Sequence, residues 1–338
     1  MPIQILSGLQ KGLHTDALLS QLLKDRGVPR DYSYTHIMPP VAVSKVSDLV
    51  GSIDVGNELQ LYDGTVGRDG LAERVAFNVG AQLRYVLQEF GFEALIRNFA
   101  KQMSDDIFDY AARQGQYPYD RMRMRIEYGV VNQTCRVAGN FPASNETLSA
   151  ARKWSNYGSA DSNPINDLLV WCTFVREESG REISGVFMSY PVWRTLQLHP
   201  TTLARLDVTG NRVMTKKILS EILEVPEDKI YISRNGLYNA ARRGRPKSLK
   251  YFWGSDVFVC AAEDPSRNEY GFGHLYHFGA SGEDPILSFR YPEYRALGGG
   301  EVVQVAALIH PLVEVPEAAY LAKSVVDTSL TIYGGKLD

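Results

Sequence analysis

The strongest constraint in this sequence is a pair of alternating segments that lie on either side of a glycine-rich turn. Apolar side chains recur at every second position from Val75 to Leu87, with mostly polar side chains between them. Ile53 to Leu61 shows a weaker alternation in the same phase, and Asp69-Gly70 lies between the two runs. Alternation at period two indicates half-buried strands, and Asp-Gly between such runs is typical of a β-hairpin. The sequence therefore predicts an extended hairpin over residues 51–90.

This hairpin needs support from outside itself. Its second strand would reach roughly 40 Å at about 3.3 Å per residue. An isolated two-stranded hairpin is only marginally stable in water. The hairpin must therefore lie on its own subunit or on a neighbouring copy, and the mixed charges at its turn make it either a soluble tip or an interface. If it is an interface, the predicted inter-subunit residues are Arg68, Asp69, Glu73, Arg74, Phe77, Leu83 and Tyr85.

Length and composition indicate a globular protein of one large domain or two ordinary ones. The 338 residues are 44% hydrophobic, and the net charge is −3 with a pI near 6.1. That balance argues against a dedicated nucleic-acid-binding protein, although one face could still contact nucleic acid. The chain has three cysteines, too few and too scattered for a disulfide framework or a zinc site, so we expect buried thiols. No segment is typical of a signal peptide or of a membrane span.

The first fifty residues are predicted to form an arm. A short amphipathic helix is expected from Leu13 to Arg26, and the chain beyond Gly27 is rich in proline and lacks periodicity. Such a segment has too few apolar contacts of its own to fold alone. We therefore expect residues 1–50 to lie extended over another surface.

A long helix is predicted in the segment that follows the hairpin. A first helix should begin at Ser104 and end near Gly115 and Pro118, with residues 90–98 as a bridge before it. A second should run over about 118–138, because apolar residues recur every four positions on its inner face. Those core residues are Met122, Ile126 and Val130. A third helix should open at Pro164 and end at Gly180.

The remainder of the chain interleaves short strands with short helices. Strands are predicted near residues 183–189, 229–233, 250–262, 274–278, 287–291 and 319–326, and the strongest over 301–315. Helices are predicted over 191–199 and 213–225. No regular strand–helix–strand rhythm is present, which favours an α+β fold over a doubly wound sheet.

No constellation of catalytic residues is visible in the sequence. There is no nucleophile elbow and no phosphate-binding loop. His274 and His277 are three residues apart in a predicted strand and would face opposite sides, so they are poor joint metal ligands. We expect neither enzymatic activity nor a cofactor. One basic cluster could be a solvated loop, a phosphate-contacting surface or a partner for acidic patches on another subunit, and it consists of Arg242, Arg243, Arg245 and Lys247.

The order of these elements resembles that of the tailed-bacteriophage major capsid proteins. Three short stretches carry the resemblance further. They are Lys153-Trp154-Ser155 followed by residues 159–164 and a helix; Gly185 to Ser189 followed by a helix that ends at His199-Pro200; and a closing strand over 318–326. The resemblance covers nearly the whole chain.

The resemblance implies a phage major-capsid fold, with a spine helix, a peripheral-domain sheet, an axial domain and an extended hairpin. Its segments would be 1–50 (N-terminal arm), 51–90 (extended hairpin loop), 91–180 (peripheral domain), 181–300 (axial domain) and 301–338 (return to the peripheral domain). It also implies a structural role. Pentamers and hexamers of the chain would tile an icosahedral shell around double-stranded DNA in the virion, assembled in the host cytoplasm.

The resemblance further implies a set of partners. These are other copies of the chain, a separate scaffolding protein, a portal, a decoration or cement protein and the packaged DNA, with no membrane. Some family members cross-link through a lysine on the extended loop, but no lysine lies between Lys45 and Lys101 here. We therefore expect a non-covalent shell, or one held by accessory proteins. Two alternatives remain open, namely an encapsulin-like shell that packages enzymes and an unrelated soluble α+β enzyme or binding protein.

Overall fold

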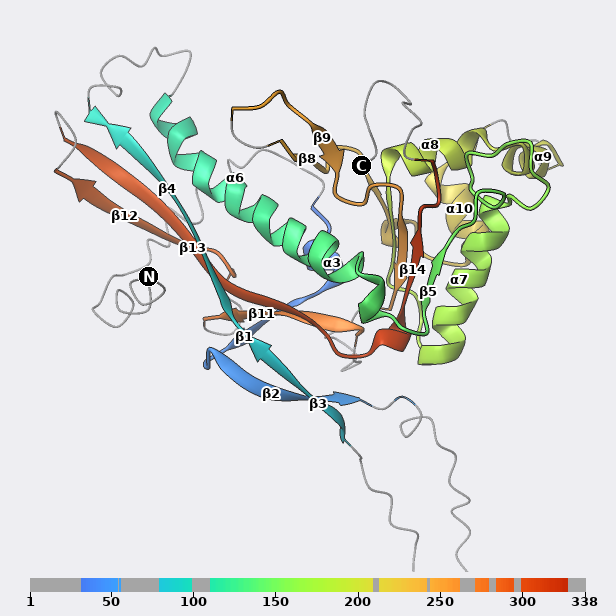
Figure 1. Cartoon of the computed structure of the whole chain (residues 1–338), viewed down its shortest axis with the longest axis horizontal. Coiled ribbons are helices and arrows are strands. Elements are labelled where there is room, and N and C mark those ends of the chain that lie inside the picture. Colours follow the sequence, from blue (N-terminus) through green and yellow to red (C-terminus); the bar gives the residue numbers. More distant parts are fainter. Residues whose placement is uncertain are drawn as a thin grey trace, which may run out of the picture.

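A computed structural model describes residues 32–53, 55, 79–98, 110–208, 213–241, 244–261, 271–279, 284–294 and 299–327. These residues form two five-stranded sheets, a long helix that lies along the first, a group of helices around the second, and two separate two-stranded hairpins (Figure 1). The α+β class predicted from the sequence is confirmed.

The first sheet is organised around β13 (Gly300–Val313), the longest described strand. It pairs along Gly300–Ile309 with β4 (Gln88–Arg97) and along Gly300–Ala306 with β12 (Leu287–Glu293), so these two strands lie on opposite edges of β13. Further along, β13 pairs with β11 (Gly273–Phe278), to which β1 (Pro40–Val43) adds in parallel. The predicted bridge over residues 90–98 is therefore wrong: most of the stretch belongs to β4, which is held in the sheet by its antiparallel pairing with β13.

The long helix α6 (Tyr110–Val130) lies along this sheet, and Figure 1 shows it running beside β4 and β13. Met122, Ile126 and Val130 are 0% exposed and belong to the main hydrophobic core. The predicted helix break near Gly115 and Pro118 is wrong, because α6 continues through both. Pro118 removes one helical hydrogen bond, at a cost of about 3 kcal/mol in a helix interior. Gly115 faces Ile96 and Val303, so packing on the sheet offsets that loss.

The end of α6 also differs from the prediction. At Val131 the helix widens into a π-helix that ends at Cys135, short of the predicted residue 138. Arg136 then donates from Nε to Asp256 Oδ2 (2.7 Å) and from Nη1 to the carbonyl oxygen of Phe252 (3.0 Å). Asp256 in turn accepts from the backbone N–H of Ser324 (2.9 Å). This buried contact fastens the end of the spine to the second sheet.

The second sheet has the order β5-β14-β10-β6-β7. Its strands are β5 (Asn145–Thr147), β6 (Gly185–Ser189), β7 (Ile230–Ser233), β10 (Val257–Cys260) and β14 (Ala319–Lys323). The helices around it are α7 (Pro164–Ser179), α8 (Tyr190–Leu198), α9 (Pro200–Val208) and α10 (Lys216–Leu223). The chain opens α7 as predicted, with the Asn163 side chain accepting from the Asn166 N–H, and ends it at Gly180 with φ 65°.

Strand pairing does not follow the predicted segment boundaries. β11 and β12 fall within residues 181–300 but pair with β13 in the first sheet. β14 falls within 301–338 but pairs with β10 in the second sheet. The chain therefore crosses between the sheets several times, and one hydrophobic core continues through both, from Ile96 on β4 to Leu321 on β14.

Two small hairpins and one short helix complete the described chain. β2 (Ser47–Ile53) pairs with β3 (Val79–Val86), and β8 (Leu237–Asn239) pairs with β9 (Leu249–Tyr251). The helix α3 (Tyr34–Ile37) precedes β1. The predicted arm is thus not extended throughout, since it contains the helix α3, the strand β1 and the beginning of β2. No described helix is long and apolar enough to cross a membrane.

Candidate subunit interface

The root of the β2–β3 hairpin is fixed to its own subunit through one face. In the antiparallel register Val50 lies opposite Leu83, and Asp48 opposite Tyr85, so these side chains share a face. The Tyr85 ring stacks on Tyr276 of β11, with centroids 4.9 Å apart and planes 10° apart. Leu87 and Leu308 complete this small apolar cluster. The hairpin therefore leaves the first sheet from a defined position.

A buried polar network lies behind this cluster. The Tyr276 hydroxyl donates to Glu314 Oε1 at 2.7 Å, and His274 Nδ1 lies 2.7 Å from the same oxygen. All three side chains are buried. The network holds the Tyr276 ring in place, so the surface on which Tyr85 stacks is rigid.

The opposite face of the hairpin root carries two exposed apolar side chains. Leu49 lies opposite Arg84, and Ser47 opposite Val86, on the face that points away from Tyr85. Leu49 is 56% exposed and Val86 is 44% exposed. Figure 1 shows the hairpin leaving the edge of the first sheet, away from the helices of the second. Within the described chain nothing packs over Leu49 and Val86, so this face can accept another molecule.

The structure separates the predicted hairpin residues into two groups. Tyr85 is buried and Leu83 is half-buried, both on the face that turns toward their own subunit. The others lie outside the described residues, and they are Arg68, Asp69, Glu73, Arg74 and Phe77. The first described strand of the hairpin, β2, begins at Ser47, earlier than the predicted start at Ile53, and most of the predicted run over 53–61 lies outside the described residues.

Leu49 and Val86 are contact candidates that the sequence reasoning missed. The signal was weak because Leu49 and Val50 are adjacent apolar residues, and because a register shift between Gly51 and Ile53 interrupts the alternation of β2. Val86 is likewise an apolar residue at a position where the alternation of β3 predicts a polar side chain. Only the pairing register shows that these residues share the outer face.

A second site joins the N-terminal segment to the spine helix. The Glu127 carboxylate on α6 is buried and accepts from the backbone N–H groups of Ser33 (3.0 and 3.1 Å) and Tyr34 (2.9 Å). It also accepts from the Ser33 hydroxyl at 2.6 Å. Trp253 Nε1 donates to that hydroxyl at 3.2 Å. Residues 33 and 34 are therefore held on the spine by one carboxylate.

The Glu127 site is electrostatically costly. Burial raises the pKa of this carboxyl to about 7, while the hydrogen bonds from Ser33 and Tyr34 and the nearby Arg123 guanidinium act in the opposite direction. Burial dominates because the carboxylate is almost completely removed from solvent, which disfavours its charged form. The attachment is thus sensitive to pH near neutrality.

The predicted basic cluster is described in part. Arg245 and Lys247 are exposed in the loop between β8 and β9, and Arg242 and Arg243 lie outside the described residues. The loop projects from a hairpin that pairs with no other described strand.

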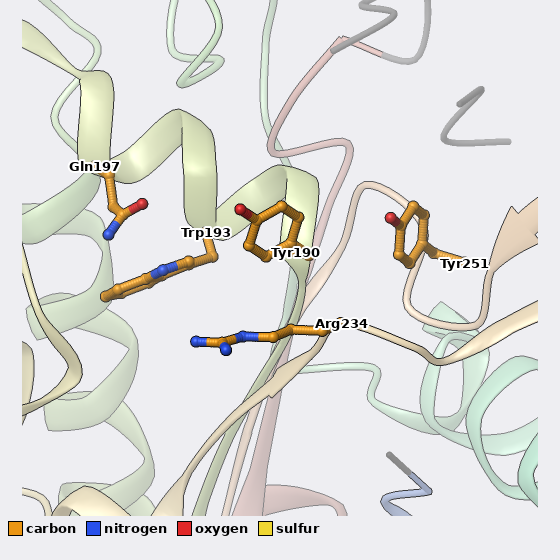
Figure 2. A pocket seen from close by; sticks show the side chains of 5 residues that line it. All are labelled: Tyr190, Trp193, Gln197, Arg234 and Tyr251. Carbon is orange, nitrogen blue, oxygen red and sulfur yellow. The ribbon is translucent and has the colours of Figure 1, made fainter. Parts of the chain in front are cut away.

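One open pocket lies beside α8. It has a volume of about 470 Å³, and Figure 2 shows its lining side chains, which are Tyr190, Trp193, Gln197, Arg234 and Tyr251. The group contains no carboxylate, thiol or imidazole that could act as a nucleophile or a general base. Elsewhere in the described chain, burial raises the pKa values of Cys172 and Cys260 to about 12, which makes both thiols poor nucleophiles. No group of side chains that could hold a metal ion occurs among the described residues.

Comparison with solved structures identifies the fold of this chain. No protein-family model and no curated protein matches the sequence. A phage-related protein from Bordetella bronchiseptica is 19% identical, with a TM-score of 0.70 over 92% of this chain and 97% of that chain. A capsid protein of cyanophage P-SCSP1u is 10% identical, with a TM-score of 0.52 over 88% of this chain and 89% of that chain. This chain has the phage-capsid fold. The fold implied by the sequence resemblance is confirmed.

A third solved structure bears on the alternatives. A virus-like particle from Pyrococcus furiosus is 14% identical, with a TM-score of 0.53 over 90% of this chain and 98% of that chain.

Proposed function

We propose that this chain is the major capsid protein of a tailed phage, a structural and non-enzymatic protein. Its copies assemble into pentamers and hexamers that form an icosahedral shell around double-stranded DNA. The observation that carries the proposal is the match of nearly the entire chain to the phage-capsid fold, at a TM-score of 0.70 for one phage-related protein and 0.52 for one phage capsid.

The hairpin supports this proposal independently. Its inner face is covered by its own subunit, because Tyr85 stacks on Tyr276. Its outer face exposes Leu49 and Val86 to solvent. Apolar side chains exposed together on a projecting strand pair are suited to an interface. We propose that this outer face lies against a neighbouring copy of the chain. The charged tip residues Arg68, Asp69, Glu73 and Arg74 stay predicted contacts of the same interface.

The remaining partners belong to the same proposal. Assembly takes place in the host cytoplasm with a separate scaffolding protein and a portal, and the product is the capsid of the virion. With no lysine between Lys45 and Lys101, the shell is held by packing and charge, with a cement protein as a further support.

The test is the size and content of particles formed by the full chain. We expect light scattering and electron microscopy of the purified protein, co-expressed with its scaffolding partner where needed, to show closed particles tens of nanometres wide. A monomer or dimer that never assembles would refute the proposal. Particles that enclose enzymes instead of nucleic acid would favour the encapsulin-like alternative.

A further inference from the structure

Positive charge gathers in one segment of this acidic protein. Residues 229–255 contain seven lysines and arginines and no aspartate or glutamate, although the whole chain has a net charge of −3. The middle of the segment forms the β8–β9 hairpin, a two-stranded sheet separate from the two large ones. The charge is therefore carried on a projection and not spread through the fold.

The described cations of this hairpin are uncompensated. Arg245 and Lys247 are exposed, and Lys250 is partly exposed. None of the three forms an ion pair with another described residue, whereas Arg290 on β12 is paired with Glu301 at 2.5 Å. Three neighbouring cations that form no ion pair with a described residue create a local positive field that attracts anions.

The positive surface continues from the hairpin onto the spine helix. The Tyr238 ring of β8 packs edge-on against Tyr128 of α6, with centroids 5.4 Å apart. The Arg125 guanidinium lies 5.7 Å from the centre of the Tyr128 ring and 4.3 Å from the centre of the Phe90 ring. One turn earlier, Arg121 is exposed and lies 4.6 Å from the centre of the Tyr117 ring. Aromatic rings thus hold these guanidinium groups in place along the flank of α6.

We infer that the β8–β9 hairpin and the adjoining flank of α6 form the surface of the shell that contacts duplex DNA, through its phosphates and without reading its sequence. This inference rests on the proposed capsid function. A strip of cations over two elements suits a linear polyanion, which presents one phosphate per roughly 1.7 Å of duplex. Contacts from Lys and Arg to the phosphates are independent of base sequence, so they would provide affinity without sequence specificity. The surface that carries α6 and the β8–β9 hairpin therefore faces the interior of the particle.

The test compares two neutralised variants of the full chain. In Arg245→Gln/Lys247→Gln the hairpin loses two cations, and in the control Lys216→Gln/Lys217→Gln the helix α10 loses two. Binding of a fluorescein-labelled duplex DNA is followed by fluorescence anisotropy over a series of salt concentrations. Each phosphate contact contributes about −0.9 to the slope of log affinity against log salt. The hairpin variant should therefore bind roughly 50-fold more weakly at about 0.1 M salt, with a slope shallower by about 1.8.

Each outcome assigns the surface. A fall in affinity and slope confined to the hairpin variant supports the inference. Equal affinity of the hairpin variant and the wild type, or an equal fall in the control, would overturn it. Binding of polyglutamate but not of DNA, with the same dependence on Arg245 and Lys247, would assign the surface to an acidic protein and would also overturn it. Light scattering on the same samples reports assembly, so a failure of the capsid proposal is seen separately.

Discussion

Glu127 provides the most quantitative prediction of the structure. Burial raises the pKa of this carboxyl group from its ordinary value of 4.5 to about 7. Between these two pH values the folded chain holds a proton that the unfolded chain has released. The folded state therefore loses stability as the pH rises from 4.5 to 7, and a shift of this size corresponds to about 3 kcal/mol at 1.36 kcal/mol per pH unit.

Replacing Glu127 with glutamine removes this proton uptake. The amide is similar in size and keeps one oxygen acceptor, but its NH₂ group meets donors, so we expect a cost of about 1–3 kcal/mol at acidic pH. The difference in stability between wild type and Glu127→Gln should narrow by about 3 kcal/mol, or reverse, as the pH rises from 4.5 to 8. The exposed Glu317→Gln variant makes the same change in charge and serves as the control.

The assay is urea denaturation of dilute, unassembled protein at a series of pH values, with tryptophan fluorescence as the signal. The midpoint of each transition, multiplied by its slope, gives the free energy of unfolding. A stability difference that does not change with pH would refute the reasoning. A difference that grows with rising pH would show that the four hydrogen bonds from Ser33 and Tyr34 outweigh the burial of the charge.

Two further predictions concern the core and the hairpin. Ile126→Asp places an unpaired charge at a fully buried position, so we expect the free energy of unfolding to fall by more than about 4 kcal/mol and the protein to be insoluble. The control Ile126→Val should lower the free energy of unfolding by only about 1 kcal/mol, as measured by thermal unfolding. Leu49→Asp changes an exposed residue, so subunit stability should stay within about 0.5 kcal/mol of wild type. Light scattering of the same variant should show no particles, while Leu49→Met should assemble; normal particles from Leu49→Asp would exclude this face as an interface.

The elements that were predictable from sequence are those that local chemistry specifies. Helix α7 was visible because Asn163, Pro164 and Gly180 mark its ends. The alternating residues of β3 and the apolar run of β13 likewise predicted strands, because each pattern reflects the faces that the strand buries.

The elements that were missed depend on partners distant in sequence. β1 is a strand because it pairs with β11, where Pro40 lies opposite Leu275, and no sequence pattern near Pro40 predicts that pairing. α6 continues through Pro118 because the sheet beneath it stabilises the helix. The Glu127 site was invisible for the same reason, since its donors lie 93 and 94 residues earlier in the chain.

The sequence predicted the hairpin that carries the candidate interface, but it did not predict which residues of the hairpin are exposed there. The sequence indicated a hairpin in need of support, and the structure describes its root. The side chains that alternate most clearly, such as Tyr85, face their own subunit, while the exposed Leu49 lies in a segment expected to belong to the arm. Period two shows that a strand has two faces, but it cannot show which face meets which neighbour.

Cryo-electron microscopy of particles assembled from the full chain tests the central proposal most directly. We expect closed icosahedral shells in which Leu49 and Val86 of each hairpin lie against an adjacent subunit and the β8–β9 hairpin points toward enclosed DNA. Particles in which the outer face of the hairpin contacts no other subunit, or a protein that forms no closed shell under any assembly condition, would contradict it.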